Sequence, residues 1–74
     1  MKIQVSCFAT LSKYTPEDGQ VELEEGATPD LVLDRLLIPR EEVKIVFING
    51  QHAGMNAVLK HGDRLGIFPA IGGG

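Results

Sequence analysis

The chain has 74 residues, of which 43% are hydrophobic, with a formal net charge of −3 and a single cysteine. This length suits one small domain, and the apolar share favours a globular core over a disordered chain. One cysteine excludes an intrachain disulfide and any iron–sulfur or cysteine-based metal site, and with them an electron-transfer role; it favours the reducing cytoplasm. The chain has no cluster of Lys and Arg, which weighs against nucleic acid as the main partner. No apolar run is long enough to cross a bilayer, and the acidic net charge favours docking on a basic protein surface.

The first part of the chain predicts a hairpin of two strands. Residues 1–9 and 20–25 alternate between apolar and polar side chains, as half-buried strands do. Residues 10–19 between them read as a long loop, so we expect the two strands to pair antiparallel. The inward-facing positions are expected to be Ile3, Val5, Cys7, Val21 and Leu23.

A short helix is expected next, because the stretch from Thr28 carries the signals of a helix start. Thr28 can cap the free N–H groups, Pro29 suits the first helical position, and Asp30 complements the positive end of the helix dipole. Pro39 is expected to end the helix. The side chains expected to form its buried stripe are Leu31, Val32, Leu36 and Leu37.

The second half of the chain predicts strands joined by turns. Residues 43–48 form an apolar strand, and the Asn-Gly pair at 49–50 is a strong tight-turn signal because both residues tolerate positive φ. Residues 51–60 are irregular, with room for a short edge strand. A turn at 61–63 then leads into a last strand over residues 65–68.

The order of these elements indicates an α+β domain. One helix must cover one face of a mixed sheet, with the first and last strands together at the centre, which is the β-grasp or ubiquitin-like arrangement. We expect a single domain over residues 1–74, in which residues 69–74 form a flexible C-terminal tail that ends on glycines.

Four short stretches give the chain a resemblance to a known family. They are Phe8-Ala9-Thr10-Leu11, Ile48-Asn49-Gly50, Gly62-Asp63 and the terminal Gly72-Gly73-Gly74. Taken with the length of the chain, they resemble the MoaD/ThiS group of ubiquitin-like sulfur carriers over nearly the whole sequence.

The resemblance implies that the protein is a co-substrate and not an enzyme. In this family an adenylating enzyme related to ubiquitin-activating enzymes (MoeB/ThiF-like) joins the C-terminal carboxylate to AMP, and a sulfur donor then converts it to a thiocarboxylate. A synthase (MoaE-like or thiazole synthase-like) takes the sulfur. Carried over, Gly74 supplies the reacting carboxylate, Gly73 completes the terminal pair, and Gly72 contacts the partner. No cofactor is bound, and ATP is used by the partner enzyme.

Glycine suits this role because a β-carbon would widen a chain that must enter a narrow channel and would restrict its backbone. The ordinary explanation of a glycine-rich end is a flexible terminus without a role. The matching order of elements and the flanking motifs favour the functional interpretation.

An exposed apolar patch is expected near the root of the tail. By strand alternation, Phe8, Val46 and Phe68 would lie together on the sheet face opposite the helix, and such a patch usually marks a docking surface. A covering loop, or a bulge that reverses the alternation, is the competing explanation. Pro69 would direct the tail away from the last strand, or simply end that strand.

The remaining candidate residues favour ordinary structural roles. Cys7 is expected to be a buried, inert thiol. His52 and His61 lie in predicted turns without a carboxylate or cysteine beside them, so they are expected to be solvated and no metal site is expected.

Three functions stay open. The first is a sulfur carrier, closer to MoaD than to ThiS because of Phe68-Pro69 and residues 8–11, which implies molybdopterin biosynthesis; the thiamine thiazole is the alternative acceptor, and tRNA-thiolation or amino-acid-pathway carriers also remain. The second is a protein modifier conjugated to lysine through Gly74. The third is a plain interaction module whose tail has no role.

Overall fold

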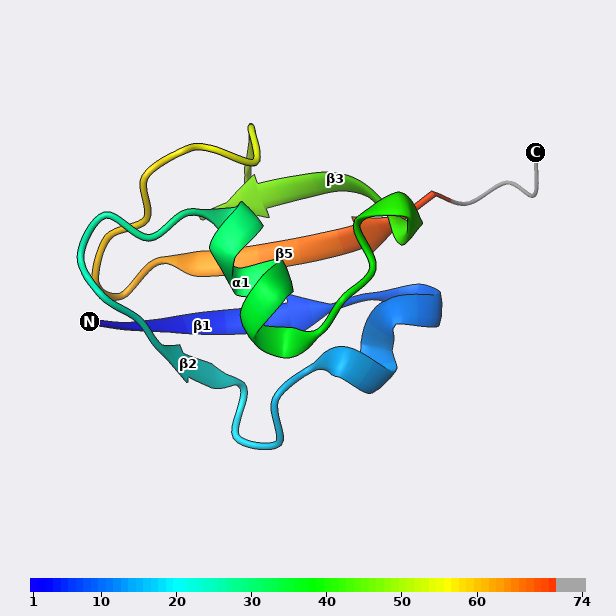
Figure 1. The fold of residues 1–74 in the computed structure, drawn as a ribbon, viewed down its shortest axis with the longest axis horizontal. Helices are drawn as coiled ribbons and strands as arrows, with labels where there is room; N and C mark the ends of the chain where they lie inside the picture. The colour runs from blue at the N-terminus through cyan, green and yellow to red at the C-terminus, as the bar shows by residue number, and fades with distance from the viewer. Residues whose placement is uncertain (71–74) are drawn as a thin grey trace.

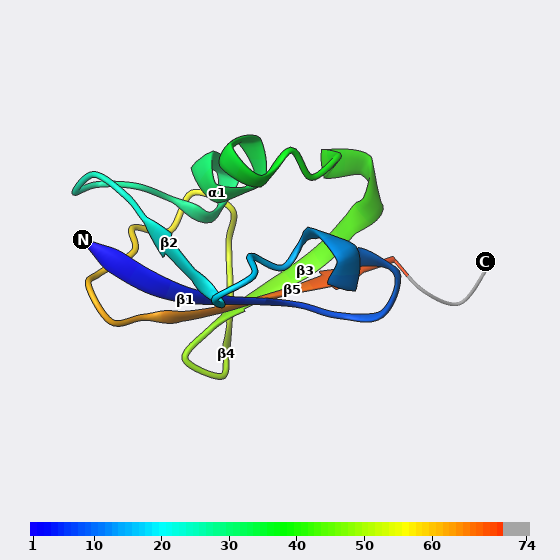
Figure 2. The ribbon, with the colours of Figure 1, turned by 90° about the horizontal axis from the view of Figure 1, so that it is seen from below.

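The computed structural model describes residues 1–70, which form a five-stranded mixed sheet with the α-helix on one face (Figures 1 and 2). The elements are β1 (Lys2–Cys7), β2 (Gln20–Glu22), α1 (Pro29–Leu36), β3 (Val43–Ile48), β4 (Gln51–Ala53) and β5 (Arg64–Pro69), with the 3-10 helices η1 (Ala9–Tyr14) and η2 (Arg40–Glu42). The strand order is β2-β1-β5-β3-β4, and β1 and β5 run parallel at the centre. The predicted β-grasp arrangement is therefore confirmed.

The predicted hairpin is confirmed, since β1 and β2 pair antiparallel with Ile3 opposite Val21. The connection between them is more regular than expected, because part of it forms η1. Leu11 explains this helix: it has no exposed surface, so η1 carries an apolar side chain back into the core.

Helix α1 begins as predicted. The Leu31 N–H donates to Thr28 Oγ1 at 3.4 Å, and Pro29 takes the first helical position. The signals that start the helix thus lie at the end of the connection from β2, and the helix lies over one face of the sheet (Figure 2).

The end of α1 differs from the prediction. The helix ends at Leu36, and Leu37 adopts a left-handed conformation with φ 61°. The Ile38 N–H then donates to the Leu33 carbonyl at 2.9 Å, which closes the last turn. Leu37 is therefore 81% exposed and not part of the buried stripe, whereas Leu33, which the predicted stripe omits, has no exposed surface.

The core fills the space between α1 and the sheet. Every inward-facing position predicted for the first two strands is buried. The buried apolar residues are Ile3, Val5, Cys7, Leu11, Val21, Leu23, Ala27, Val32, Leu33, Ile38, Val46, Leu59, Leu65 and Ile67. Within residues 1–70, no helix has the length and apolar character needed to cross a membrane.

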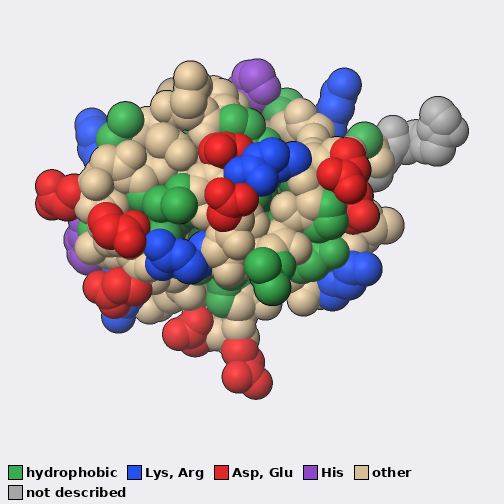
Figure 3. All heavy atoms as spheres, in the orientation of Figure 1, with side chains coloured by type: hydrophobic (Ala, Val, Ile, Leu, Met, Phe, Trp, Pro, Cys, Tyr) green, Lys and Arg blue, Asp and Glu red, His purple; other side chains and the backbone are tan. Residues whose placement is uncertain are grey.

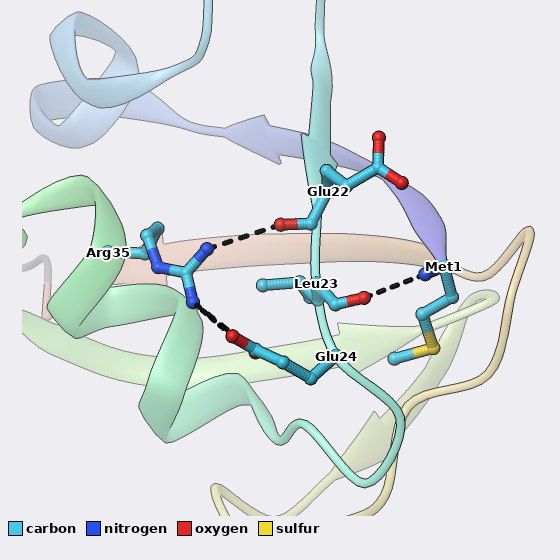
Figure 4. Close-up of polar contacts among 5 residues, drawn as sticks. All are labelled: Met1, Glu22, Leu23, Glu24 and Arg35. Atoms are coloured by element: carbon cyan, nitrogen blue, oxygen red, sulfur yellow. Dashed lines mark hydrogen bonds and ion pairs between the residues drawn. The ribbon is translucent and has the colours of Figure 1, made fainter.

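Polar contacts hold residues 22–24, where β2 ends, to α1 and to the start of the chain. Arg35 pairs with Glu24 at 3.2 Å and donates to the Glu22 carbonyl at 3.3 Å, while the Met1 amine donates to the Leu23 carbonyl at 2.7 Å (Figure 4). A backbone hydrogen bond at Glu24 lowers the pKa of the Glu24 carboxyl from its usual value, and the nearby Arg35 guanidinium lowers it further. The Arg35–Glu24 pair is exposed, so it is expected to add little to the free energy of unfolding.

Candidate functional site

Three aromatic rings gather on the sheet face opposite α1. The rings of Phe8 and Phe68 stack with their centroids 4.3 Å apart and their planes 6° apart. Phe47 meets Phe68 edge-to-face, with centroids 5.4 Å apart. We call Phe8, Phe47 and Phe68 the aromatic cluster. Phe8 remains 41% exposed, so the cluster presents apolar surface to solvent.

The backbone around Phe8 holds its ring over β5. The Phe8 N–H donates to the Ile67 carbonyl at 3.0 Å, which continues the β1–β5 pairing by one residue. The next residue, Ala9, has a positive φ of 52° and turns the chain into η1. A non-glycine residue in this conformation is strained. The strain is tolerated where it directs Phe8 outward and Leu11 inward.

Gly66 gives the stacked rings their space. It lies on the same face of β5 as Phe68, and a Cβ built on it would meet Phe68 Cε1 and Phe8 Cε2, each at 3.4 Å. A larger side chain at this position would enter the volume that the two rings occupy. The sequence interpretation does not identify Gly66, because nothing in the sequence says which rings pass over it.

The predicted place of Val46 on this open face is wrong. Val46 lies opposite Ile67 in the β3–β5 pair and is 1% exposed. Residues directly opposite each other in an antiparallel pair share a face, and Ile67 faces the core. Phe47, opposite Gly66, takes the predicted position instead.

The alternation of β3 could not have settled this question alone, because the strand is apolar at almost every position. A register shift between Val43 and Ile45 further disturbs the pattern near the start of the strand. The pairing with β5 decides which side chains face the core, and pairing is a tertiary property.

Two grooves border the aromatic cluster, and both include Phe47 and Phe68. The first has a volume of about 370 Å³ and is also lined by Gln4, Ser6, Phe8, Gly50, Arg64, Leu65 and Gly66. The second has a volume of about 430 Å³ and is also lined by Lys44, Ile45, Pro69 and Ala70. Among residues 1–70, no Asp or Glu lines either groove.

The tail begins later than the predicted boundary at residue 69. Pro69 is the last residue of β5, so the strand ends there as one of the two predicted roles requires, but Pro69 still pairs opposite Val43 and its side chain is buried. The Ala70 N–H donates to the Glu42 carbonyl at 3.3 Å. Residues 69 and 70 therefore belong to the folded body, and Pro69 offers little surface to a partner.

The predicted reacting residues Gly73 and Gly74, and the predicted contact residue Gly72, lie outside the described residues. The structure places Ala70, the last described residue before them. The described chain reaches Ala70 beside the second groove, at the end of the sheet marked by the red end of β5 in Figure 1.

The side chains of Cys7, His52 and His61 each contact other parts of the fold. Burial raises the pKa of the Cys7 thiol, which keeps it protonated and unreactive. His61 Nδ1 accepts a hydrogen bond from the Lys2 N–H at 3.0 Å, and His52 lies in β4 with its ring edge-on to Phe47, 5.9 Å between centroids. The prediction of merely solvated turn histidines is therefore incomplete. The described residues hold no group of side chains that could bind a metal ion.

A sequence-family comparison matches this chain to the ThiS family over residues 5–74, a range that includes the terminal glycines. No curated protein sequence matches the chain.

Solved structures resemble the whole chain. A putative molybdopterin converting factor, subunit 1, from Pyrococcus furiosus is 26% identical, with a TM-score of 0.75 over 96% of this chain and 99% of that one. SAMP1 from Haloferax volcanii is 23% identical, with a TM-score of 0.74 over 100% of both chains. A chain in the complex of subunits 1 and 2 of the molybdopterin-converting factor from Helicobacter pylori is 16% identical, with a TM-score of 0.60 over 100% of both. The last two likenesses concern the fold alone.

Proposed function

The chain belongs to the ThiS family, and on that premise we propose that it is a sulfur carrier whose Gly74 carboxylate is adenylated and then converted to a thiocarboxylate. The observation that supports this most is that the family match includes the terminal glycines and that the described chain ends next to an exposed aromatic cluster. The match runs through Gly74, and β5 brings the chain to Ala70 at the rim of an exposed aromatic cluster. An enzyme that docks on the cluster is thereby close to the residues that follow.

The proposed chemistry needs no side chain of this protein. A carboxylate oxygen of Gly74 attacks the α-phosphorus of ATP, and pyrophosphate leaves. Hydrosulfide then attacks the acyl carbon, and AMP leaves with the original oxygen. Cys7 is buried with a raised pKa, so it is unsuited to accept the acyl group. We propose that the adenylating enzyme binds the ATP and that this chain acts as its co-substrate in the cytoplasm, without a cofactor of its own.

The aromatic cluster is the proposed docking surface for the partners. A packed, partly exposed group of rings on the open sheet face, near the end of β5, provides apolar contact area that is already ordered before binding. Phe8 and Phe68 keep the role predicted for them, and Phe47 replaces Val46. The similar chain from Helicobacter pylori lies in a protein–protein complex of subunits 1 and 2, and we propose that a synthase subunit or an adenylating enzyme docks here in turn.

We propose molybdopterin as the first acceptor pathway, because the Pyrococcus furiosus neighbour carries that description at 26% identity over nearly the whole chain. The family name favours the thiamine thiazole as the alternative. A protein modifier joined to lysine through Gly74 is the second candidate function, since a protein named SAMP1 shares the fold over its full length. Isolation of this chain in isopeptide linkage to other proteins would favour the modifier.

The proposal is tested by incubating the protein with its cognate adenylating enzyme, ATP and sulfide. We expect intact-mass spectrometry to show one oxygen replaced by sulfur and fragmentation to locate the sulfur on Gly74. The matched control carries one additional residue after Gly74, so that the carbon to be activated is an internal amide; it should gain no sulfur. Equal sulfur incorporation in the extended protein would contradict the proposal.

A substitution at Gly66 tests the docking role separately from folding. We expect Gly66→Val to weaken binding to the adenylating enzyme by about tenfold, or ~1.4 kcal/mol, because its methyl groups displace the rings of Phe8 and Phe68. Gly66 has no positive φ, and valine suits a strand, so the free energy of unfolding should change by no more than about 1 kcal/mol. Urea unfolding and titration calorimetry measure the two quantities. If Gly66→Val binds the adenylating enzyme with unchanged affinity, the aromatic cluster is not part of the docking surface.

A further inference from the structure

The ion-paired carboxylates of this protein lie on one side of the sheet. The three ion pairs among residues 1–70 all lie on the helix side: Arg35 with Glu24, and Arg40 with Asp30 and Asp34. Figure 3 looks onto this side, and acidic side chains are spread across it. Lys and Arg side chains also lie on this side, and Glu22 lies on the other face, opposite Lys2, so the net charge does not describe the surface around the grooves.

The grooves on the opposite face carry the other sign. Arg64 lines the first groove and Lys44 lines the second, and within residues 1–70 neither contacts an acidic side chain closely enough to form an ion pair. Both side chains are exposed. The surface around the aromatic cluster is thus locally cationic, although the whole chain carries a net charge of −3.

The two cations stand at opposite ends of the aromatic cluster. Arg64 begins β5, and Lys44 follows Val43, which lies opposite Pro69 at the other end of β5. Lys44 lines a groove with Phe68, which is four residues along the strand from Arg64, so about 13 Å of strand separates Arg64 from the end of β5 near Lys44 at ~3.3 Å per residue. Each cation can therefore meet a separate group on a partner.

We propose that the surface formed by the aromatic cluster, Lys44 and Arg64 fits a partner whose docking surface has an apolar centre with carboxylates on two sides of it. Resting on the proposed function, we assign this partner as the adenylating enzyme. The inference reverses the expectation from net charge, which favoured a basic partner surface. Charge complementarity supports it, because two exposed cations flank the rings and, within residues 1–70, no carboxylate opposes them there.

Charge reversal tests the inference. Association with the purified cognate adenylating enzyme is measured by stopped-flow fluorescence without ATP, for the wild type, Lys44→Glu, Arg64→Glu and a control, Lys60→Glu. Lys60 is exposed and lines neither groove, and its reversal changes the net charge equally. We expect each reversal at the grooves to lower the association rate about tenfold at low salt, and the control less than about twofold. Added salt should reduce the difference.

Several outcomes would overturn the inference. One is that Lys60→Glu slows association as much as the groove variants do, since net charge would then be the cause. Another is faster association of the groove variants, which would indicate a basic partner. A third is self-association of the wild type, seen by analytical ultracentrifugation and lost in Lys44→Glu, because the acidic side of a second copy would then be the occupant.

The proposed function is judged separately in the same experiment. An enzyme that binds the wild type but never produces the thiocarboxylate would contradict the proposed function while leaving the charge assignment intact. An enzyme that produces the thiocarboxylate at equal rates from all four proteins would contradict the charge assignment alone.

Discussion

A Val46→Asp substitution is expected to unfold the domain, whereas Phe47→Asp, one residue along the same strand, is expected to leave it folded. Val46 is 1% exposed and faces Ile67 in the core, so an aspartate there would be a buried charge without a partner. The cost should exceed about 4 kcal/mol, which is most of the stability of a small domain. Phe47 lies on the open face, where a carboxylate can reach water.

Phe47→Asp should lose docking although it stays folded, which separates it from a variant that fails to dock because it is unfolded. Phe47→Asp removes one ring of the aromatic cluster and places a negative charge between the two grooves, so we expect affinity for the adenylating enzyme to fall by about a hundredfold. Urea unfolding followed by circular dichroism gives the stability, and calorimetry gives the affinity. Val46→Ala serves as the milder core control, with an expected loss of a few kcal/mol, about 2 to 4. A folded Val46→Asp protein that fails to dock would instead place Val46 on the open face.

A Gly73→Val substitution is expected to abolish formation of the thiocarboxylate without affecting the fold. The branched side chain widens the chain next to the reacting carboxylate and restricts its backbone, so the end should no longer enter the site of the adenylating enzyme. The chemistry of the carboxylate itself is untouched. Intact-mass measurement over time should therefore show no sulfur incorporation.

The matched control is Gln51→Val, which places the same branched side chain at an exposed residue of β4 that lines neither groove. We expect this variant to gain sulfur at close to the wild-type rate, and both variants to unfold at the wild-type urea concentration. Normal sulfur incorporation by Gly73→Val would show that the terminal glycines have no role in the reaction and would favour the plain interaction module.

The sequence predicts the strands and turns of this fold well because local chemistry determines them. Alternation marks β1, and Asn49 and Gly50, with φ of 54° and 82°, form the expected tight turn into β4. The start of α1 follows equally from Thr28 and Pro29. Each of these features depends on residues that are neighbours in the chain.

The errors arise where periodicity gives no signal, or where distant residues decide. Periodicity cannot show that α1 closes through a left-handed Leu37, which exposes that side chain and buries Leu33. A strand that is apolar throughout does not show that Val46 faces the core, because only its pairing with β5 does so. The space above Gly66 depends on a ring contributed by Phe8, far away in the chain.

The proposed docking surface is predictable in kind and only partly in detail. Alternation within their own strands is enough to find Phe8 and Phe68, and the structure brings their rings into contact. The cations Lys44 and Arg64 give no local signal, because their importance comes from the absence of acidic neighbours among the described residues of the assembled face.

The central position of β5 has a consequence for how the protein is made. Strand β5, the last strand within residues 1–70, pairs with β1 on one side and with β3 on the other. Residues 64–69 must therefore be present before the β1–β2 and β3–β4 pairs can join into one sheet. During synthesis the complete sheet therefore cannot form until β5 has been made. A chain that stops short of β5 also lacks Leu65 and Ile67, which fill part of the core. Folding is thereby a check on completeness: only a chain translated through β5 forms the surface on which an activating enzyme is proposed to dock.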